Sequence, residues 1–297
     1  MKISVILPNY NHAAFLRERI ESILAQTRKP DEIIFLDDAS TDTSLQIEQE
    51  YDCFSKVIVN KENSGSPFKQ WLKGIDSASG DYVWIAESDD ACDPRMLERL
   101  AGEAERGAVL AFCRSLETGP EGESLGIQRY QAGFREDFTM DGPAFVRKYL
   151  SRRNVVANAS SALFRRDAAL RVDPAFTGFH GAGDILFWAG LARQGKVSFV
   201  AEPLNRFRQH GGNRTSEDAL NGRGLHESLL VYRELERQGA LDSCQFRQIV
   251  ADNRYRLLYG LPSLPEEVRK TALEEWDGGF PVDFLVALKR IKRKLWK

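Results

Sequence analysis

Acidic side chains follow two apolar segments of the chain, at the points where the predicted strands end. Positions 87–90 read Glu-Ser-Asp-Asp and come directly after the apolar run 82–85, and positions 37–38 read Asp-Asp and follow the run 32–36. Loops that leave the carboxyl ends of strands in an open α/β sheet form the ligand crevice. Carboxylate oxygens clustered there suit a divalent cation that carries phosphates. The residues therefore predict a site for a metal-bound nucleotide.

The first 115 residues alternate strand-like and helix-like segments. Short apolar runs predict buried strands, and apolar residues that recur every three or four positions predict helices. The predicted strands are 3–8, 32–36, 56–59, 82–85 and 109–113, and the predicted helices between them are 13–26, 43–51, 68–78 and 94–106. Repeated strand-helix units imply a mostly parallel sheet with helices on both faces. The acidic segments should then meet at one edge of that sheet.

The remainder of the chain is less regular. Positions 115–139 show no clear period, and we expect an insertion or a long mobile loop there. Further elements are expected as a strand at 160–164, a helix at 184–193 and a strand at 197–200. From about residue 216 to the end, the pattern is helical.

Composition limits the classes of partner and the compartment. The formal net charge of -2 and pI near 6.2 argue against nucleic-acid binding, which usually needs a basic domain. The cysteines are widely spaced and form no metal-binding pattern, which favours a reducing compartment. The apolar run after Met1-Lys2 is too short for a signal peptide, and no run is long enough to span a membrane. We expect a cytoplasmic protein whose membrane contact, if any, is peripheral to the inner face of the cell membrane.

Four motifs together resemble the bacterial family 2 glycosyltransferases of GT-A fold. The first predicted strand ends in Pro-Asn-Tyr-Asn (8–11), the second in Asp-Asp-Ala-Ser-Thr-Asp (37–42), the third leads to Asn-Ser-Gly (63–65), and the fourth to Glu-Ser-Asp-Asp. The family typically shows P-x-Y-N, D-D-x-S-x-D, N-x-G and a D-x-D-like metal motif in this order. The resemblance covers about residues 3–210 and implies a Rossmann-like, mostly parallel α/β sheet.

The resemblance also implies roles for individual residues. The residues that it assigns to the nucleotide are Pro8, Tyr10, Asn11, Asp37, Asp38, Asn63 and Glu87. Asp89, Asp90 and His210 would hold Mn²⁺ or Mg²⁺, and Arg208 and His210 would bind the diphosphate. Glu87 stands where the family usually has Asp, which lengthens the side chain by one methylene. The alternative for the aspartates at 38, 42, 89 and 90 is that they cap turns or helices.

A third segment with an acidic residue resembles the one that carries the catalytic base in this family. Positions 181–184 read Gly-Ala-Gly-Asp at the start of a predicted helix, with Gly183 where Glu is commoner. An acceptor hydroxyl must lose its proton as it attacks the anomeric carbon, and Asp184 is the expected base. Its alternative role is that of an ordinary N-cap residue.

The resemblance implies an inverting transfer of a sugar from a nucleoside-diphosphate sugar, with a UDP-sugar favoured, to a saccharide or lipid-linked acceptor. Synthesis of bacterial cell-surface polysaccharide or glycolipid is the expected context. The expected organisation is a catalytic domain at 1–215, with a nucleotide-sugar half at 1–115 and an acceptor half at 116–215, followed by a helical extension at 216–297. The alternative function is a non-catalytic sugar-nucleotide-binding protein of a polysaccharide assembly complex. The glycine-rich loops of dehydrogenases and P-loop enzymes are absent from the sequence.

The last helix combines an apolar stripe with basic residues. Phe284, Leu288, Ile291 and Leu295 recur at helical spacing. The basic residues Lys289, Arg290, Arg293, Lys294 and Lys297 lie mostly elsewhere around the helix. Such a helix either rests on an anionic membrane surface or packs on the domain with a solvated basic face.

Overall fold

The computed structural model describes residues 1–211, 222–261 and 264–295, with side chains described up to residue 291. One mixed sheet organises this part of the chain, in the order β3-β2-β1-β4-β9-β6-β10-β5, with β7 beside β6 and β8 beside β10. The strands are β1 (Ile3–Asn9), β2 (Glu32–Asp37), β3 (Lys56–Val59), β4 (Tyr82–Ile85), β5 (Ala91–Cys92), β6 (Ala108–Thr118), β7 (Ser124–Ile127), β8 (Phe138–Asp141), β9 (Ala162–Arg165) and β10 (Lys196–Arg208).

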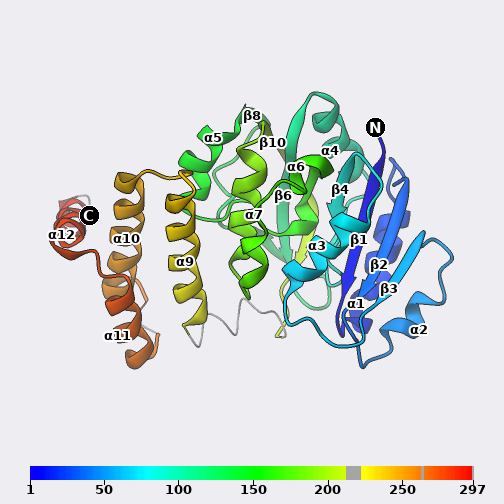
Figure 1. Ribbon diagram of the computed structural model, residues 1–297, viewed down its shortest axis with the longest axis horizontal. Helices are drawn as coiled ribbons and strands as arrows, with labels where there is room; N and C mark the ends of the chain where they lie inside the picture. The colour runs from blue at the N-terminus through cyan, green and yellow to red at the C-terminus, as the bar shows by residue number, and fades with distance from the viewer. Residues whose placement is uncertain (212–221, 262–263, 296–297) are drawn as a thin grey trace.

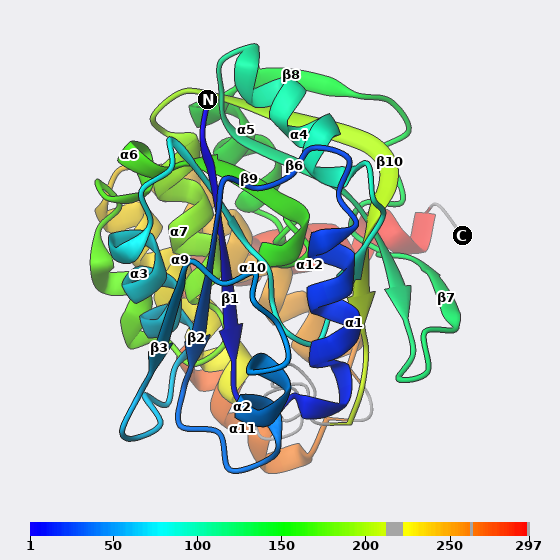
Figure 2. The same cartoon turned by 90° about the vertical axis from the view of Figure 1, so that its right-hand side faces the viewer.

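The main helices cover both faces of this sheet, as Figure 2 shows with α1 on one side and α3 on the other. The α-helices are α1 (Ala13–Leu24), α2 (Ser44–Glu48), α3 (Pro67–Ser77), α4 (Met96–Glu105), α5 (Gly142–Phe145), α6 (Arg166–Ala169), α7 (Gly183–Ala192), α9 (Arg223–Arg237), α10 (Ser243–Tyr259), α11 (Glu266–Glu275) and α12 (Gly279–Leu295). Short turns of other helix types lie at Val146–Leu150, Ala159–Ser161 and Pro174–Gly178. Every residue of β1 and β4 is buried, which explains why both strands are continuous apolar runs.

The parallel sheet predicted for the first 115 residues is confirmed. β1 pairs in parallel with β2 and β4, and β2 pairs in parallel with β3. β9 then runs antiparallel between β4 and β6, so β6 and its parallel neighbour β10 point the same way as β1. The loops that follow β1, β2, β4 and β10 therefore leave at the same edge of the sheet.

The expectation of a long loop at 115–139 is wrong in part. β6 continues to Thr118, β7 occupies Ser124–Ile127, and β8 begins at Phe138. β7 is a four-residue strand with half-exposed or exposed side chains, and Gly126 within it has φ of 109°. A strand this short, with little apolar alternation, owes its conformation to antiparallel pairing with β6 rather than to its own residues.

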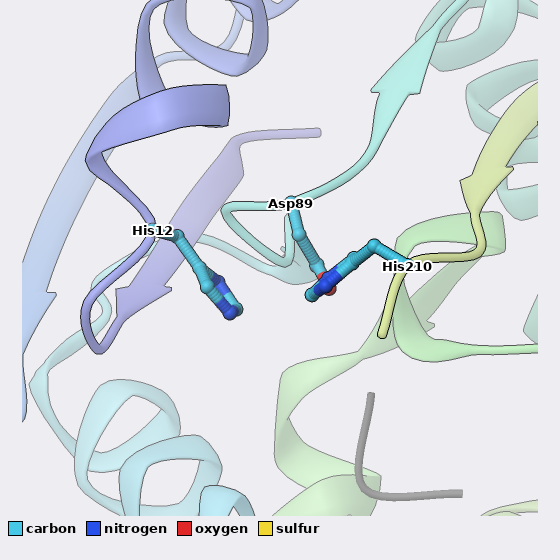
Figure 3. Close-up of side chains that lie close together, drawn as sticks. All are labelled: His12, Asp89 and His210. Atoms are coloured by element: carbon cyan, nitrogen blue, oxygen red, sulfur yellow. The ribbon is translucent and has the colours of Figure 1, made fainter. Parts of the chain in front are cut away.

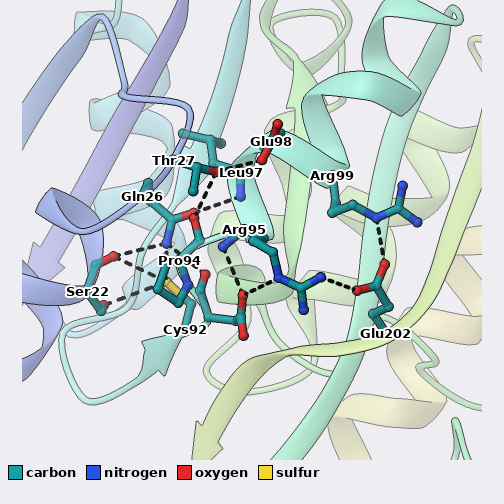
Figure 4. A network of polar contacts seen from close by, with 11 residues as sticks. Ser22, Gln26, Thr27, Cys92, Pro94, Arg95, Leu97, Glu98, Arg99 and Glu202 are labelled. Carbon is teal, nitrogen blue, oxygen red and sulfur yellow. Dashed lines mark hydrogen bonds and ion pairs between the residues drawn. The ribbon is translucent and has the colours of Figure 1, made fainter.

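The acidic loop after β4 is anchored between α1 and α4 (Figure 4). The side chain of Gln26, just after α1, donates hydrogen bonds to the carbonyls of Ser22 (3.0 Å) and Asp93 (2.9 Å) and accepts one from the Leu97 amide (2.8 Å). Gln26 is fully buried, so all three bonds are shielded from water. The far end of the acidic loop is thereby fixed to two helices.

The helical C-terminal region is confirmed, and it packs in series on the sheet domain (Figure 1). α9 contacts α7, α10 contacts α9, and α12 contacts α10. Leu229 and Tyr232 of α9 belong to the same apolar core as Leu186 and Trp188 of α7. The predicted domain boundary at 215/216 lies outside the described residues.

The last helix packs with one apolar face and exposes another. Val282 and Val286 are buried, whereas Phe280 is 82% exposed and Phe284, Leu288 and Ile291 are also exposed. The predicted stripe is therefore on the solvent side as far as residue 291, and the side chains of 292–297 lie outside the described residues. Within the described residues, no helix combines the length and apolarity needed to cross a membrane.

Candidate active site

Three side chains from three different loops converge at the edge where the parallel strands end (Figure 3). His12 follows β1, Asp89 follows β4, and His210 follows β10. One ligand atom from each lies within 4.8 Å of the other two. His210 Nε2 lies 3.1 Å from Asp89 Oδ2, and His12 Nδ1 lies 2.8 Å from the Ser88 hydroxyl. Of the three predicted metal ligands, Asp89 and His210 belong to this cluster.

The donor set of the cluster fits a divalent transition metal. Burial alone would raise the pKa of Asp89, but the His210 hydrogen bond and the nearby histidine charges outweigh it and lower the pKa. Asp89 is therefore a carboxylate at neutral pH. Two imidazoles with one carboxylate suit Mn²⁺ better than Mg²⁺, which prefers oxygen ligands.

Asp90 faces inward rather than toward the cluster. Its Oδ1 accepts from the Arg208 amide at 3.0 Å, and its Oδ2 accepts from Asn158 Nδ2. Asp90 is 1% exposed, and burial together with the Asp89 charge raises its pKa to about 7. In this arrangement Asp90 braces the acidic loop against β10.

Arg208, the predicted diphosphate ligand, is 2% exposed. Its guanidinium donates to the carbonyls of Asp89 (2.8 Å) and Pro120 (2.8 Å) and pairs with Glu18. These bonds fix the backbone of Asp89, so the geometry favours a positioning role over direct contact with a diphosphate.

The carboxylate pair after β2 accepts a dense set of internal hydrogen bonds. Asp37 accepts from Asn9 Nδ2 (3.0 Å) and from the Ser40 amide (2.7 Å). Asp38 accepts from the side chains of Asn60 (2.6 Å), Gln70 (2.8 Å) and Ser64 (2.7 Å), and from the Ser64 amide (2.9 Å). Asn63 adds a bond to the Asp38 carbonyl at 3.2 Å. The two residues thus join the loops after β1, β2 and β3.

The loops after β1 and β2 hold two residues in the left-handed region, which few residues other than glycine adopt. Asn11 has φ of 54° and Ala39 has φ of 62°. The Asn11 side chain accepts from the Thr41 amide at 2.7 Å, which locks the two loops together. Pro8 is buried inside β1, whereas Tyr10 is 40% exposed and is available to a ligand. Strained backbone of this kind concentrates at ligand sites.

Asp42 has the capping role that we considered for it. Its Oδ1 accepts from the Ser44 amide in α2, and its Oδ2 accepts from the Ala13 amide in α1, each at 2.9 Å. One carboxylate therefore accepts from the first amide of each helix, beside the N-cap residues His12 and Thr43.

Glu87 turns from the acidic loop toward α3. Its Oε1 accepts from Trp71 Nε1 at 2.7 Å, and its amide donates to the Ser160 hydroxyl at 3.1 Å. Burial and the Asp89 charge raise the pKa of Glu87 to about 8. The buried guanidinium of Arg19, stacked 4.9 Å from the Trp84 ring, opposes this rise.

Asp184 occupies the first turn of α7, where its Oδ2 accepts from Asn154 Nδ2 at 2.5 Å. The N-cap residue is Ala182, so the alternative of Asp184 as the N-cap is wrong. Burial raises the pKa of Asp184 to about 7, which suits a general base. Position 183 is Gly where the family commonly has Glu. In this structure a Cβ at that position would lie 2.3 Å from the Phe176 carbonyl oxygen, so a side chain there would clash.

The loop before Asp184 is held by a carboxylate from the C-terminal region. Glu227 of α9 accepts from the amides of His180 (2.6 Å), Gly181 (2.8 Å) and Ala182 (3.0 Å). Consecutive amides ahead of a helix make a natural carboxylate site. The C-terminal helices therefore help to position the expected base.

Residues 4–171, more than half of the chain, match the sequence model of the family described as Glycosyl transferase family 2. The chain belongs to this family. The chain is 30% identical over 245 residues to the uncharacterized glycosyltransferase YibD of Escherichia coli, an alignment that covers 80% of this chain and 65% of YibD. The chain thus spans less than two thirds of that relative's length.

Two solved structures show the same fold as this chain. Staphylococcus aureus TarS in complex with UDP-GlcNAc has a TM-score of 0.70 and 22% identity, covering 96% of this chain and 84% of that chain. Mannosyltransferase PcManGT from Pyrobaculum calidifontis, in complex with GDP-Man and Mn²⁺, has a TM-score of 0.59 and 17% identity, covering 98% and 79%. The predicted GT-A type α/β fold is confirmed.

Three residues of the candidate site were not predicted from the sequence. His12 lies one position beyond the Pro-Asn-Tyr-Asn motif, and its place at the same strand edge as Asp89 was the available signal. Asn154 and Glu227 are 30 and 43 positions from Asp184, on segments without a recognisable motif. Only the fold brings these two residues to the base.

Proposed function

We propose that the chain is an inverting glycosyltransferase that moves a sugar from a nucleoside-diphosphate sugar to a hydroxyl acceptor. One observation carries the proposal: in a GT-A fold, a half-buried carboxylate with a pKa of about 7 lies at the start of α7, and a His-Asp-His cluster lies on the loops after β1, β4 and β10. One base and one metal suffice for a single displacement. A retaining hydrolase would need two carboxylates astride the scissile bond.

His12, Asp89 and His210 are the proposed ligands of a divalent cation, with Mn²⁺ preferred over Mg²⁺ for its tolerance of imidazole. When bound, the cation supplies positive charge for the diphosphate that leaves, in place of a protein general acid. Arg208 and Asp90 keep the Asp89 backbone in place for this purpose.

Asp184 is the proposed base of the displacement. The acceptor O–H proton passes to the Asp184 carboxylate, the freed oxygen electron pair forms a bond to the anomeric carbon, and the bond from that carbon to the diphosphate oxygen breaks. The departing electron pair stays on the diphosphate. Asn154 Nδ2 donates to one carboxylate oxygen and so orients the group.

The nucleoside is assigned to the loops after β1, β2 and β3. Tyr10 offers an exposed ring for the nucleobase to contact. Hydrogen bonds of Asn11, Asp37, Asp38 and Asn63 hold the loops in the shape that receives the nucleotide. Glu87 is proposed for the ribose, with its carboxylate oriented by Trp71. A UDP-sugar is the favoured donor.

The acceptor is proposed to be a saccharide or lipid-linked glycan of bacterial cell-surface polysaccharide or glycolipid synthesis, and the protein to work in the cytoplasm beside the membrane. The exposed apolar side chains of α12, with Lys289 and Arg290 beside them, support peripheral membrane contact. Flotation with anionic vesicles tests this contact. Unchanged flotation after Phe280, Phe284 and Ile291 are replaced by Ser would contradict it.

The test of the function is incubation with UDP-, GDP-, CDP- and dTDP-sugars and Mn²⁺, with release of the nucleoside diphosphate as the readout. We expect release with one donor class, dependence on Mn²⁺, and inversion of the anomeric centre by NMR of the product. Asp52 is an exposed carboxylate away from the site, so Asp52→Asn is the matched control for Asp→Asn variants of the site residues. Nucleotide binding with Mn²⁺ but no turnover of any donor would favour the non-catalytic binding protein instead.

A further inference from the structure

A cavity of about 750 Å³ lies between α10, α12 and the segment that follows α5. Its cationic lining residues are Arg129, Arg147, Arg152, Arg153, Arg256 and Lys289. The cavity is far larger than one inorganic ion needs and has the size of a typical organic-ligand site. A cavity with this lining is suited to a ligand with more than one anionic group.

The positive charge of the cavity is poorly balanced. Asp252 is the single carboxylate among its lining residues, and it pairs with Lys289. Across residues 1–211, 222–261 and 264–291, none of the five arginines forms an ion pair with an Asp or Glu side chain. Arg129 and Arg153 instead stack on the Tyr130 ring, at 4.6 and 5.3 Å. The guanidinium planes are thus preoriented, with donors left for an anion.

The cavity adjoins the expected base. Arg153 is the chain neighbour of Asn154, which donates to Asp184. The charges of Arg256, Asp184 and Arg153 also all act on the hydroxyl of buried Tyr232, whose pKa is raised mainly by burial. A ligand in the cavity would therefore contact the segment whose next residue, Asn154, orients the proposed base. The donor cluster, by contrast, stands on the loops after β1, β4 and β10.

We propose that this cavity binds the phosphate groups of the acceptor. The inference rests on the proposed function, because it names the class of acceptor that Asp184 would deprotonate. Arginine forks bind phosphate oxygens in pairs, which places the ligand as well as attracting it. Two sources offer this chemistry: a soluble phosphate-bearing glycan, and a phosphate headgroup on the lipid that α12 would approach.

The experiment measures anion binding to the full chain without donor and with a metal chelator present. One arm titrates inorganic tripolyphosphate by calorimetry, and the other uses phosphatidylcholine vesicles with and without phosphatidylglycerol. The test variant is Arg152→Gln with Arg256→Gln, and Arg147→Gln is a second, single variant. The matched control is Arg247→Gln. Arg247 is an exposed arginine of α10, the helix that also carries Arg256, and it does not line the cavity.

We expect the double variant to weaken binding by about 10- to 100-fold, since each arginine supplies charge-assisted hydrogen bonds, and Arg247→Gln to leave it unchanged. Loss in the tripolyphosphate arm supports a soluble source, and loss confined to phosphatidylglycerol vesicles supports a lipid source. Absence of binding in both arms, or equal weakening by Arg247→Gln, would overturn the proposal. Because this experiment contains no sugar donor, its outcome does not depend on whether the protein transfers sugar. The two proposals can therefore fail independently.

Discussion

The donor edge of the sheet and the basic cavity beside α10 are built in opposite ways. At the donor edge, carboxylates such as Asp37, Asp38 and Asp90 accept hydrogen bonds from neighbouring loops. In the cavity, arginines from several segments face one another with a single carboxylate among them. The donor-edge carboxylates are hydrogen-bonded within the protein, whereas among the described residues the arginines of the cavity form no ion pair with Asp or Glu.

The difference follows from what each region would bind. A nucleotide and its metal are small and invariant in shape, so a preorganised set of loops lowers the cost of binding them. An acceptor varies in length and shape, and long arginine side chains adapt to it while supplying attraction. The proposed base, Asp184, accepts a hydrogen bond from Asn154, and Glu227 of α9 accepts from the amides just ahead of it.

The largest expected effect tests the donor edge. Asp89→Asn removes the one carboxylate of the metal cluster, so we expect weaker Mn²⁺ binding and a loss of turnover of at least about 100-fold. Electron paramagnetic resonance of free Mn²⁺ measures the binding, and Asp52→Asn serves as the control. Unchanged Mn²⁺ affinity in Asp89→Asn would show that the cluster of His12, Asp89 and His210 is not the metal site.

A smaller effect tests the base through pH. Since the pKa of Asp184 is raised to about 7 by burial and the deprotonated form is active, turnover at saturating Mn²⁺ and donor should rise about tenfold per pH unit below pH 7 and then level off. The folded state binds this proton more tightly than the unfolded state, so the contribution of Asp184 to stability falls as pH rises from about 4 to 7.

Replacement of Asn154 tests whether the pH dependence of activity belongs to Asp184. The Asn154 hydrogen bond lowers the pKa of Asp184, so Asn154→Ala should move the rise in activity to higher pH. A rise that stays in place would assign the titration to another group.

The smallest of these effects tests the link between the two halves. Glu227→Gln removes the charge that receives three amides ahead of α7, so we expect a loss of about 1–3 kcal/mol in unfolding free energy and a several-fold drop in kcat. Glu236→Gln, on the same helix and without a side-chain hydrogen bond among the described residues, is the control. An unchanged kcat with lowered stability would limit Glu227 to a structural role.

The donor half could be predicted from sequence because its signals are local. β3 and β4 have the predicted bounds, since short apolar runs between turn residues leave little choice of position. Asp89 and His210 were both predicted as metal ligands, and their side chains lie 3.1 Å apart.

The rest depends on contacts that no local pattern encodes. Glu227 reaches the base loop only because α9 packs on α7, and the arginines of the cavity come from segments up to 127 positions apart, from Arg129 to Arg256. β7 escaped notice because its pairing with β6, rather than its own sequence, stabilises it. Neither kind of contact has a spacing that can be recognised beforehand.

The most direct test of the proposed mechanism separates donor binding from proton transfer to Asp184. Asp184→Asn keeps the size of the side chain and the donor edge but removes the base. We predict that this variant binds Mn²⁺ and the nucleotide as the wild type does while sugar transfer falls by about 100- to 10,000-fold. Transfer at the wild-type rate in Asp184→Asn would contradict the assignment of Asp184 and, with it, the proposed mechanism.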